Sequence, residues 1–228
     1  MFKDFIRLIF PHNCPSCDNV LSRAEGAVCD ECLLAIEETK FHQSPKSNEL
    51  YFRFAGKVAL AGAAALYFYD KRGRFKRMMQ ALKYGRKPQV GSFLGEFYGK
   101  MLQRDGAFAN ATHVIPVPLH RKRKAERGYN QSEKIAAGLA KGLGIELNTK
   151  ALARVGATQT QTRKGKSARW ENVKSVFELK QPVSGHVILV DDVITTGATL
   201  EACLRVLQAQ ETPPASIVVI ALGMARFG

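Results

Sequence analysis

Residues 187–199, Val-Ile-Leu-Val-Asp-Asp-Val-Ile-Thr-Thr-Gly-Ala-Thr, carry the clearest structural signal in the chain. The apolar run at its start predicts a fully buried strand over residues 186–190, and two adjacent acids follow at the carboxyl end of that strand. A Thr-Thr-Gly-Ala-Thr turn then leads into a helix predicted over residues 198–210. In an open α/β sheet, ligands bind at the carboxyl ends of the strands. We therefore expect a ligand-binding site at this turn.

The groups in this turn suit a ribose 5-phosphate. Consecutive backbone N–H groups, three hydroxyls and a helix N-terminus favour a phosphate, and Gly197 lets the backbone approach it closely. The carboxylates of Asp191 and Asp192 can accept hydrogen bonds from the vicinal hydroxyls of a sugar. The alternative interpretation is a strand with acids at its solvated end and a polar helix cap. The segment is not a P-loop, because no Gly-Lys-Ser/Thr follows.

Short apolar strands alternate with helices along much of the chain. Further strands are predicted over residues 58–69, 112–117, 152–155 and 216–222, and helices over residues 74–84, 90–104 and 130–143. Asn130 and Glu133 form a capping box at the start of the last of these helices. The stripe of Phe75, Met78, Met79 and Leu82 at helical spacing is typical of a core-facing surface. The pattern predicts an α/β fold with a mostly parallel sheet and helices on both faces.

The first 50 residues contain a paired cysteine motif. Cys14 and Cys17 form one Cys-x-x-Cys pair, and Cys29 and Cys32 form a second pair after eleven residues. Four thiolates complete the tetrahedral set that zinc prefers, with no open position, so we predict a structural zinc site. A redox pair is the alternative. Cys203 stands apart and is interpreted as a small buried apolar residue.

The region around the cysteines is expected to hold little regular structure. A short helix is predicted over residues 3–10, and Asp30 is expected to cap another that runs through residues 33–38. Residues 42–49 are polar, contain Pro45 and resemble a linker. The N-terminal residues are too short and too charged for a signal peptide, and the longest apolar run, residues 58–69, is too short to span a membrane. We therefore expect a cytoplasmic protein.

The charge is distributed unevenly. Residues 1–50 hold five Lys/Arg and eight Asp/Glu, a net charge of −3, whereas residues 51–228 hold 29 and 12, a net charge of +17. The positive field of the second part should attract polyanions such as nucleotides, pyrophosphate or nucleic acid. A solvated basic surface is the alternative.

Residues 187–199 resemble the motif that binds phosphoribosyl pyrophosphate (PRPP) in type I phosphoribosyltransferases. The resemblance implies that Asp191 and Asp192 face the ribose 2′- and 3′-hydroxyls. It also implies that the turn wraps the 5-phosphate with Thr195, Thr196, Gly197, Ala198 and Thr199, and that Mg²⁺ bridges the ribose oxygens and the pyrophosphate of PRPP. Hypoxanthine-type members carry an aspartate at the position of Thr195, which argues against nucleobase salvage of that kind.

Other motifs resemble the ComF/GntX family of competence-related proteins. They are residues 113–120, Arg-Gly-Tyr-Asn-Gln-Ser-Glu at 127–133, Leu-Lys-Tyr at 82–84, the leading Cys-Pro-x-Cys, and the spacing of Gln161, Arg169 and Asn172. In that family a zinc module precedes a phosphoribosyltransferase-like domain, and its members are linked to natural transformation and to internalised single-stranded DNA. The resemblance implies a zinc module and linker over residues 1–50. It further implies a phosphoribosyltransferase-like domain over residues 51–228, with a hood over 51–110 and the PRPP-binding core over 111–228.

Several residues are candidate phosphate or pyrophosphate ligands. The segment at Pro118 would form a loop under the pyrophosphate, and five basic residues crowd positions 121–127. The candidates are Pro118, Arg127, Tyr129, Asn130, Arg163 and Arg169. The loop of residues 156–168, with its basic side chains, is either a lid over PRPP or an ordinary surface loop. His113 and His120 are interpreted as structural or capping residues.

Three hypotheses about function follow. Residues 71–87 carry eight Lys/Arg and no acid, and Phe75 and Tyr84 are available to stack on bases, which is typical of single-stranded DNA binding. The candidate nucleic-acid ligands are Arg74, Lys76, Arg77, Lys83 and Tyr84, and a solvated helix is the alternative. A second hypothesis is an active phosphoribosyltransferase with an unidentified acceptor. In the third, the cysteine module docks a DNA-translocating ATPase or another competence protein.

Overall fold

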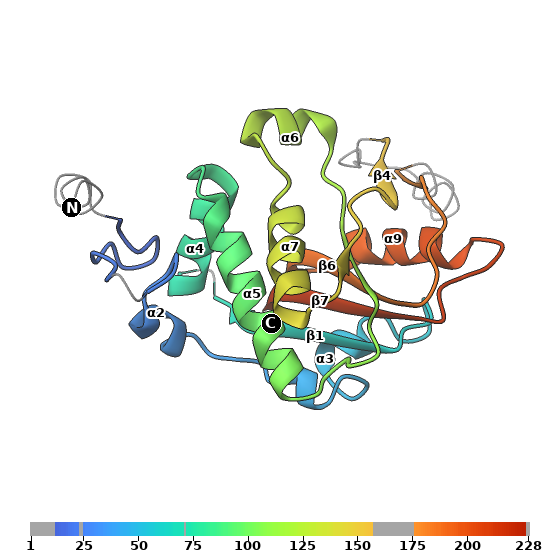
Figure 1. Cartoon of the computed structure of the whole chain (residues 1–228), viewed down its shortest axis with the longest axis horizontal. Coiled ribbons are helices and arrows are strands. Elements are labelled where there is room, and N and C mark those ends of the chain that lie inside the picture. Colours follow the sequence, from blue (N-terminus) through green and yellow to red (C-terminus); the bar gives the residue numbers. More distant parts are fainter. Residues whose placement is uncertain (1–11, 23–24, 71, 157–175, 227–228) are drawn as a thin grey trace.

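The computed structural model describes residues 12–22, 25–70, 72–156 and 176–226, and Figure 1 shows its central sheet with helices around it. The sheet has five strands in the order β1-β7-β6-β2-β3, and every neighbouring pair is parallel. The strands are β1 (Gly62–Tyr69), β2 (His113–Pro116), β3 (Glu146–Leu147), β6 (His186–Ile194) and β7 (Ser216–Ala225). The predicted parallel α/β architecture is confirmed.

Helices cover both faces of the sheet. One face packs against α4 (Arg74–Tyr84), α5 (Pro88–Arg104) and α7 (Gln131–Leu143), and the other packs against α3 (Glu49–Phe52) and α9 (Ala198–Gln208). Along β6, Ile188 and Val190 join the first core, whereas Val187 and Leu189 join the second. This alternation arises because successive side chains of a strand point to opposite faces. Burial on both faces explains the unbroken apolar run in the sequence.

Smaller elements complete the described part of the chain. They are α2 (Asp30–Leu34), the 3-10 helix η1 (Phe41–Gln43), α6 (Arg121–Arg127), β4 (Leu152–Arg154) and β5 (Phe177–Leu179). The strands β4 and β5 form a separate antiparallel pair. The helix predicted over residues 3–10 lies outside the described residues.

Helices α5 and α7 lie side by side at unusually short range, because both carry glycines spaced by four residues (Figure 1). A Cβ on Gly95 would lie 2.2 Å from the carbonyl oxygen of Ile135, and a Cβ on Gly138 would lie 2.0 Å from that of Ser92. Only glycine permits this approach. The contact holds α7 against α5 and so positions the first turn of α7 beside the carboxyl ends of β2 and β6.

Two predicted elements differ from the structure near the site. Strand β6 was expected to end at Val190, but it pairs with β7 as far as Ile194, so Asp191 and Asp192 are strand residues. No helix was predicted over residues 121–127, but they form α6, which has no buried residue and therefore no apolar stripe to reveal it. The Asn130 cap of α7 is confirmed, since its side chain accepts from the Ser132 N–H at 3.1 Å. Glu133 instead pairs with Lys124 at 3.5 Å.

Two further expectations fail near the N-terminus. Asp30 does not cap α2, because Cys29 is the N-cap residue and the helix ends at Leu34. Residues 42–49 are not a simple linker, because they include part of η1 and the start of α3, with His42 and Asn48 buried. The Asn48 side chain donates to the carbonyl of Ala63 at 2.9 Å and so ties this segment to β1.

Candidate functional site

The two acids at the end of β6 are held by neighbouring helices. Asp191 accepts a hydrogen bond from the Ser132 hydroxyl of α7 at 3.0 Å. Asp192 is only 5% exposed, and its Oδ2 lies 2.9 Å from Nζ of Lys83 on α4. Asp191 is partly exposed at the adjoining cavity and is thus the more open of the two.

The pKa of Asp191 is strongly perturbed. Burial and, after it, the neighbouring charge of Asp192 raise the pKa of Asp191 from 3.8 to about 7, although the backbone N–H of Asp192, Ser132 and Lys83 oppose the shift. An ionised carboxylate in a buried site is costly, and a second one beside it adds repulsion. Near neutral pH this carboxyl group can therefore either accept or donate a hydrogen bond to a sugar hydroxyl.

The turn after the acids is open to solvent. Thr195, Thr196 and Ala198 are exposed, whereas Gly197 is buried and has a φ of 81° as the N-cap residue of α9. A Cβ at Gly197 would be strained at this φ and would lie 3.1 Å from the ring of Phe54. The first N–H groups of a helix have no intrahelical acceptor, so this turn offers donors to an anion.

A buried arginine supports the turn from behind. Arg53, the residue that follows α3, donates hydrogen bonds to the carbonyl oxygens of Thr195 and Ala225, which joins the turn to the end of β7. It is 8% exposed. Arg53 lies outside every recognised motif and 142 residues from Thr195 in the sequence, so no local pattern points to this role.

A cavity of about 280 Å³ connects the acids to the basic helix α6. Four cations border it: Lys83, Arg123, Arg127 and Arg154. Burial, and then the charge of Arg123, lower the pKa of Arg154, so an anion between these guanidinium groups would relieve an unfavourable environment. The other lining residues are Tyr84, Val117, Pro118, Leu119, Asn130, Gln131, Ser132, Asp191, Asp192, Val193 and Thr199.

The structure brings together some of the predicted phosphate ligands. Pro118, Arg127 and Asn130 border the cavity with both acids, and the Asn130 side chain holds the loop by donating to the carbonyl of Val117 at 3.0 Å. Tyr129 instead donates from its hydroxyl to the carbonyl of Leu82. Arg163 and Arg169 lie outside the described residues. Arg123, Arg154 and Ser132 were not among the predicted ligands, because only the tertiary fold brings them to the acids.

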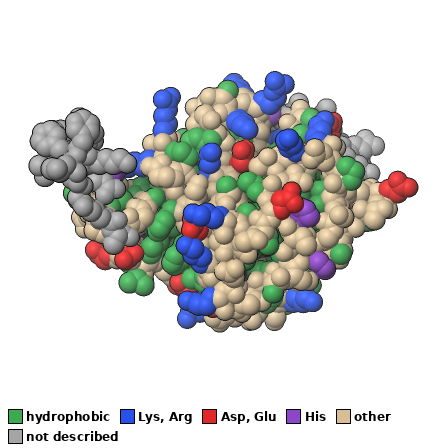
Figure 2. Space-filling model, in the orientation of Figure 1, with side chains coloured by type: hydrophobic (Ala, Val, Ile, Leu, Met, Phe, Trp, Pro, Cys, Tyr) green, Lys and Arg blue, Asp and Glu red, His purple; other side chains and the backbone are tan. Residues whose placement is uncertain are grey.

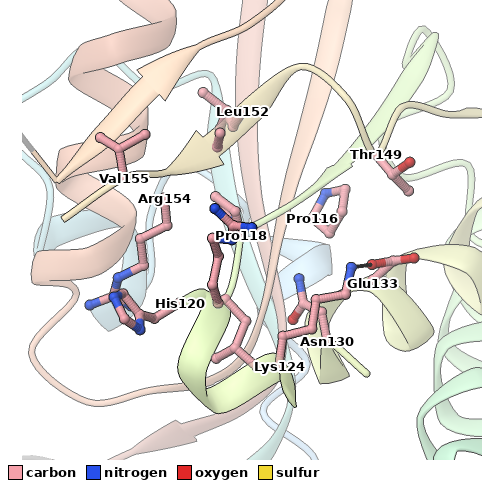
Figure 3. A pocket seen from close by; sticks show the side chains of 13 residues that line it. Pro116, Pro118, His120, Lys124, Asn130, Glu133, Thr149, Leu152, Arg154 and Val155 are labelled. Atoms are coloured by element: carbon pink, nitrogen blue, oxygen red, sulfur yellow. Dashed lines mark hydrogen bonds and ion pairs between the residues drawn. The ribbon is translucent and has the colours of Figure 1, made fainter. Parts of the chain in front are cut away.

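A second cavity of about 420 Å³ lies beside the first, between α6 and β4 (Figure 3). Both cavities are bordered by Pro118, Leu119, Asn130 and Arg154. Figure 3 shows Arg154 extending from β4, and the ion pair of Lys124 with Glu133 on the opposite wall. His120 also borders this cavity and caps α6, accepting from the Lys122 N–H at 3.3 Å, as its predicted capping role requires.

The predicted nucleic-acid ligands on α4 have different surroundings. Arg74 and Arg77 contact the cysteine module, and Lys83 faces the acids. Tyr84 is 73% exposed, and the guanidinium group of Arg127 lies 5.1 Å from its ring centre. The expectation that Phe75 stacks on bases is wrong, because Phe75 is 1% exposed. Its burial with Met78, Met79 and Leu82 confirms the predicted core stripe.

The four N-terminal cysteines form a cluster. Their sulfur atoms all lie within 4.8 Å of one another, and Cys14, Cys29 and Cys32 are buried. Four thiolates at this spacing are the donor set that zinc takes in structural sites, so the cluster could hold a metal ion such as zinc. Cys203 lies on α9 and is buried in the core, as predicted. In the parts of the chain that the structure describes, no helix combines the length and apolar character needed to cross a membrane.

Comparisons with known proteins give several relatives, although no family model matches the chain. It is 32% identical over 134 residues to "DNA utilization protein YhgH" of Salmonella typhi, covering 57% of this chain and 59% of that protein. "Competence protein F" of Haemophilus influenzae is 37% identical over 99 residues, covering 42% and 43%. "Competence protein ComFC" of Bacillus subtilis is 26% identical over 203 residues, covering 85% and 77%. The chain therefore matches less than two thirds of the length of the first two relatives.

Solved structures give more distant likenesses. Glutamine PRPP amidotransferase from B. subtilis, complexed with ADP and GMP, has a TM-score of 0.44 and 20% identity, covering 64% of this chain and 30% of that one. Adenine phosphoribosyltransferase from Saccharomyces cerevisiae has a TM-score of 0.36 and 18% identity, covering 60% and 72%. By sequence, the chain is a homologue of the proteins named DNA utilization protein YhgH, competence protein F and ComFC, which confirms the predicted resemblance.

Proposed function

We propose that this chain is a ComF-like protein that binds PRPP with Mg²⁺ and also binds single-stranded DNA, and that it acts in natural transformation or in the use of external DNA. The observation that carries the proposal is the cavity at the carboxyl end of β6. There two acids face four cations, beside an open turn at the N-terminus of α9. A diol, a 5-phosphate and a pyrophosphate each find groups of suitable chemistry in this arrangement.

Each part of the ligand is assigned to particular groups. The turn at 195–199 binds the 5-phosphate, and Asp191 and Asp192 accept from the ribose hydroxyls. Arg127, with Arg123 and Arg154, binds the pyrophosphate, and Arg163, Arg169 and Tyr129 remain candidates for it. Because Lys83 already lies beside Asp192, Mg²⁺ would be held mainly by oxygens of PRPP itself. Bound there, Mg²⁺ would neutralise charge on the pyrophosphate.

Calorimetric titration of PRPP tests the ligand. The wild type is expected to bind PRPP in the presence of Mg²⁺, and the Asp191→Asn/Asp192→Asn double variant is expected to bind at least about 100-fold more weakly, because two charge-assisted hydrogen bonds are lost. Asp70→Asn is the control, since Asp70 is an exposed acid directly after β1, which is separated from β6 by β7. Equal affinity in the wild type and the double variant would contradict the proposal.

Single-stranded DNA binding is supported by the charge and by Tyr84. Figure 2 shows Lys and Arg side chains over much of this face of the molecule, including the region of α6 and the end of α4, and Tyr84, the last residue of α4, is exposed. In fluorescence anisotropy with a single-stranded oligonucleotide, affinity is expected to fall steeply with salt, and Tyr84→Ala to weaken it about tenfold. Phe52→Ala is the control, because Phe52 is also an exposed aromatic residue but lies on α3. Salt-insensitive binding, or equal losses in both variants, would count against this part.

An active phosphoribosyltransferase is a second candidate function, favoured by the second cavity. The two cavities share four lining residues, so an acceptor in the second cavity would lie next to PRPP bound in the first. The acceptor would attack the anomeric carbon as the bond to pyrophosphate breaks, and pyrophosphate would leave with the bonding electrons. Release of pyrophosphate that depends on an added acceptor would identify this activity. The cysteine module remains a candidate docking surface for a DNA-translocating ATPase or another competence protein.

A further inference from the structure

We infer that the cysteine module positions Lys83 at the acids through helix α4, and that it thereby sets the affinity of the cavity for a pentose phosphate. The inference rests on the proposed function and concerns Arg74 and Arg77, which act as positioning residues. It links two regions that the sequence motifs treat as separate modules.

The first turn of α4 is held by both cysteine pairs. Arg74 donates to Sγ of Cys32 at 3.4 Å and to the carboxylate of Glu31 at 3.0 Å, within the second pair. From the first pair, the Ser16 hydroxyl donates to the carbonyl of Arg74 at 3.1 Å, and the carbonyl of Ser16 accepts from Arg77. These directional contacts fix the position of the helix along its axis and its rotation about that axis.

The last turn of α4 carries Lys83 into the candidate site. Its Nζ lies 2.9 Å from Oδ2 of Asp192, and only 24% of its side chain is exposed. Helix α4 spans 11 residues, so at about 1.5 Å per residue its two ends lie about 15 Å apart and move together. Between them the helix is held by apolar packing of Phe75, Met78, Met79 and Leu82, which is non-directional and fixes its position less tightly.

The ammonium group of Lys83 matters because the ligand is an anion. Without it, a sugar phosphate would face two neighbouring carboxylates, and their repulsion would oppose binding. With Lys83 in place, Asp192 is neutralised and its remaining acceptor capacity serves the sugar hydroxyls. A shift of α4 by an ångström would lengthen the contact and weaken this effect.

A metal in the cysteine cluster would fix the two Cys-x-x-Cys loops relative to each other, and with them Ser16 and Glu31. The N–H of Arg74 that points to Cys32 would stabilise the thiolate that a metal requires. Metal binding and sugar phosphate binding are therefore coupled through α4. Linkage requires each to strengthen the other by the same factor.

The test uses the full chain, Zn²⁺ and ribose 5-phosphate. Removing Zn²⁺ from the wild type is expected to lower affinity for ribose 5-phosphate by about tenfold. The Lys83→Met variant is expected to lose a similar amount of affinity for ribose 5-phosphate. Its affinity should also no longer depend on Zn²⁺. The Arg74→Ala/Arg77→Ala variant should bind ribose 5-phosphate more weakly while retaining one Zn²⁺. Lys57→Ala is the control and should bind as the wild type does, because Lys57 is exposed and its side chain makes no hydrogen bond or ion pair with any residue that the structure describes. Ribose 5-phosphate should also slow the transfer of Zn²⁺ to a chelator in the wild type but not in Lys83→Met.

Several outcomes would overturn the inference. Equal affinity of the Zn²⁺-free and Zn²⁺-loaded wild type, with both folded by circular dichroism, would remove the coupling. If the Zn²⁺-free chain unfolds, unchanged affinity in the loaded Arg74→Ala/Arg77→Ala variant would overturn the inference instead. A purified chain that holds no metal would also overturn it. Failure of the loaded wild type to bind either ribose 5-phosphate or PRPP would overturn the proposed function together with the inference.

Discussion

The Asp191→Asn variant is expected to unfold at a higher temperature than the wild type at pH 8. Burial and the charge of Asp192 raise the pKa of Asp191 to about 7 in the folded chain, well above its ordinary value of 3.8. The folded state therefore binds this proton more tightly than the unfolded state, and stability falls as the pH rises from about 4 through 7. A shift of about three pKa units corresponds to about 4 kcal/mol, which solvent at this partly exposed carboxyl group reduces. Asparagine removes the charge and should therefore add about 2 kcal/mol to the free energy of unfolding at pH 8. Thermal unfolding followed by circular dichroism at pH 5 and pH 8 measures the effect.

The neighbouring acid gives a control of opposite sign. Asp192 is paired with Lys83, so Asp192→Asn would leave a largely buried ammonium group without its partner, and this variant should be less stable than the wild type at pH 8. Two results would mean that Asp191 does not carry a raised pKa. One is an Asp191→Asn variant that is less stable than the wild type at pH 8, and the other is a gain in stability at pH 8 that is no larger than the gain at pH 5. Both variants should bind PRPP poorly, so a stabilised Asp191→Asn would show that the site keeps this carboxylate at a cost in stability.

Replacing Gly138 by alanine is expected to destabilise the fold by about 3 kcal/mol or more. Helix propensity alone predicts the opposite, a gain of about 1 kcal/mol. The added Cβ would lie 2.0 Å from the carbonyl oxygen of Ser92 and 2.7 Å from the backbone N of Glu96, and backbone atoms of α5 cannot move without separating the helices. Because α7 carries Ser132, the same change should also disturb Asp191.

The adjacent residue supplies the matched control. Ala137→Gly makes the reverse substitution one position earlier in α7, where the side chain is only partly buried, and should cost about 1 kcal/mol through helix propensity. Denaturant unfolding of both variants measures the difference. If Gly138→Ala were as stable as the wild type, the result would contradict the conclusion that α5 and α7 lie too close together for a Cβ at this position.

Much of the fold could be predicted from local patterns. The apolar run at 187–190 identified a strand buried on both faces, and the stripe on α4 identified its core-facing side. The glycines at 91, 95, 99, 138 and 142 follow a spacing of four that could have revealed the helix crossing. Helix α6 could not be found this way, because it packs no side chain into a core. The extent of β6 could not either, because its last residues are strand only through pairing with β7.

The candidate site divides in the same way. Asp191, Asp192 and the turn are contiguous in the sequence, so the kind of ligand that they suit could be predicted from the sequence alone. Lys83 was predicted to belong to a basic DNA-binding stripe. No pattern in the nearby sequence indicates that the last turn of α4 lies against residues that are over 100 positions away in the chain. Arg53 and Arg154 depend on tertiary packing in the same way. Phe75 was misassigned as a stacking residue although its own helical spacing marked it as core.

The most direct test of the central claim is a crystal structure of the chain with ribose 5-phosphate bound. The phosphate should accept hydrogen bonds from backbone N–H groups of residues 196–199, and the 2′- and 3′-hydroxyls should lie within hydrogen-bonding distance of Asp191 or Asp192. A phosphate held only by the arginines of α6, with the turn and both acids free of the sugar, would contradict the account.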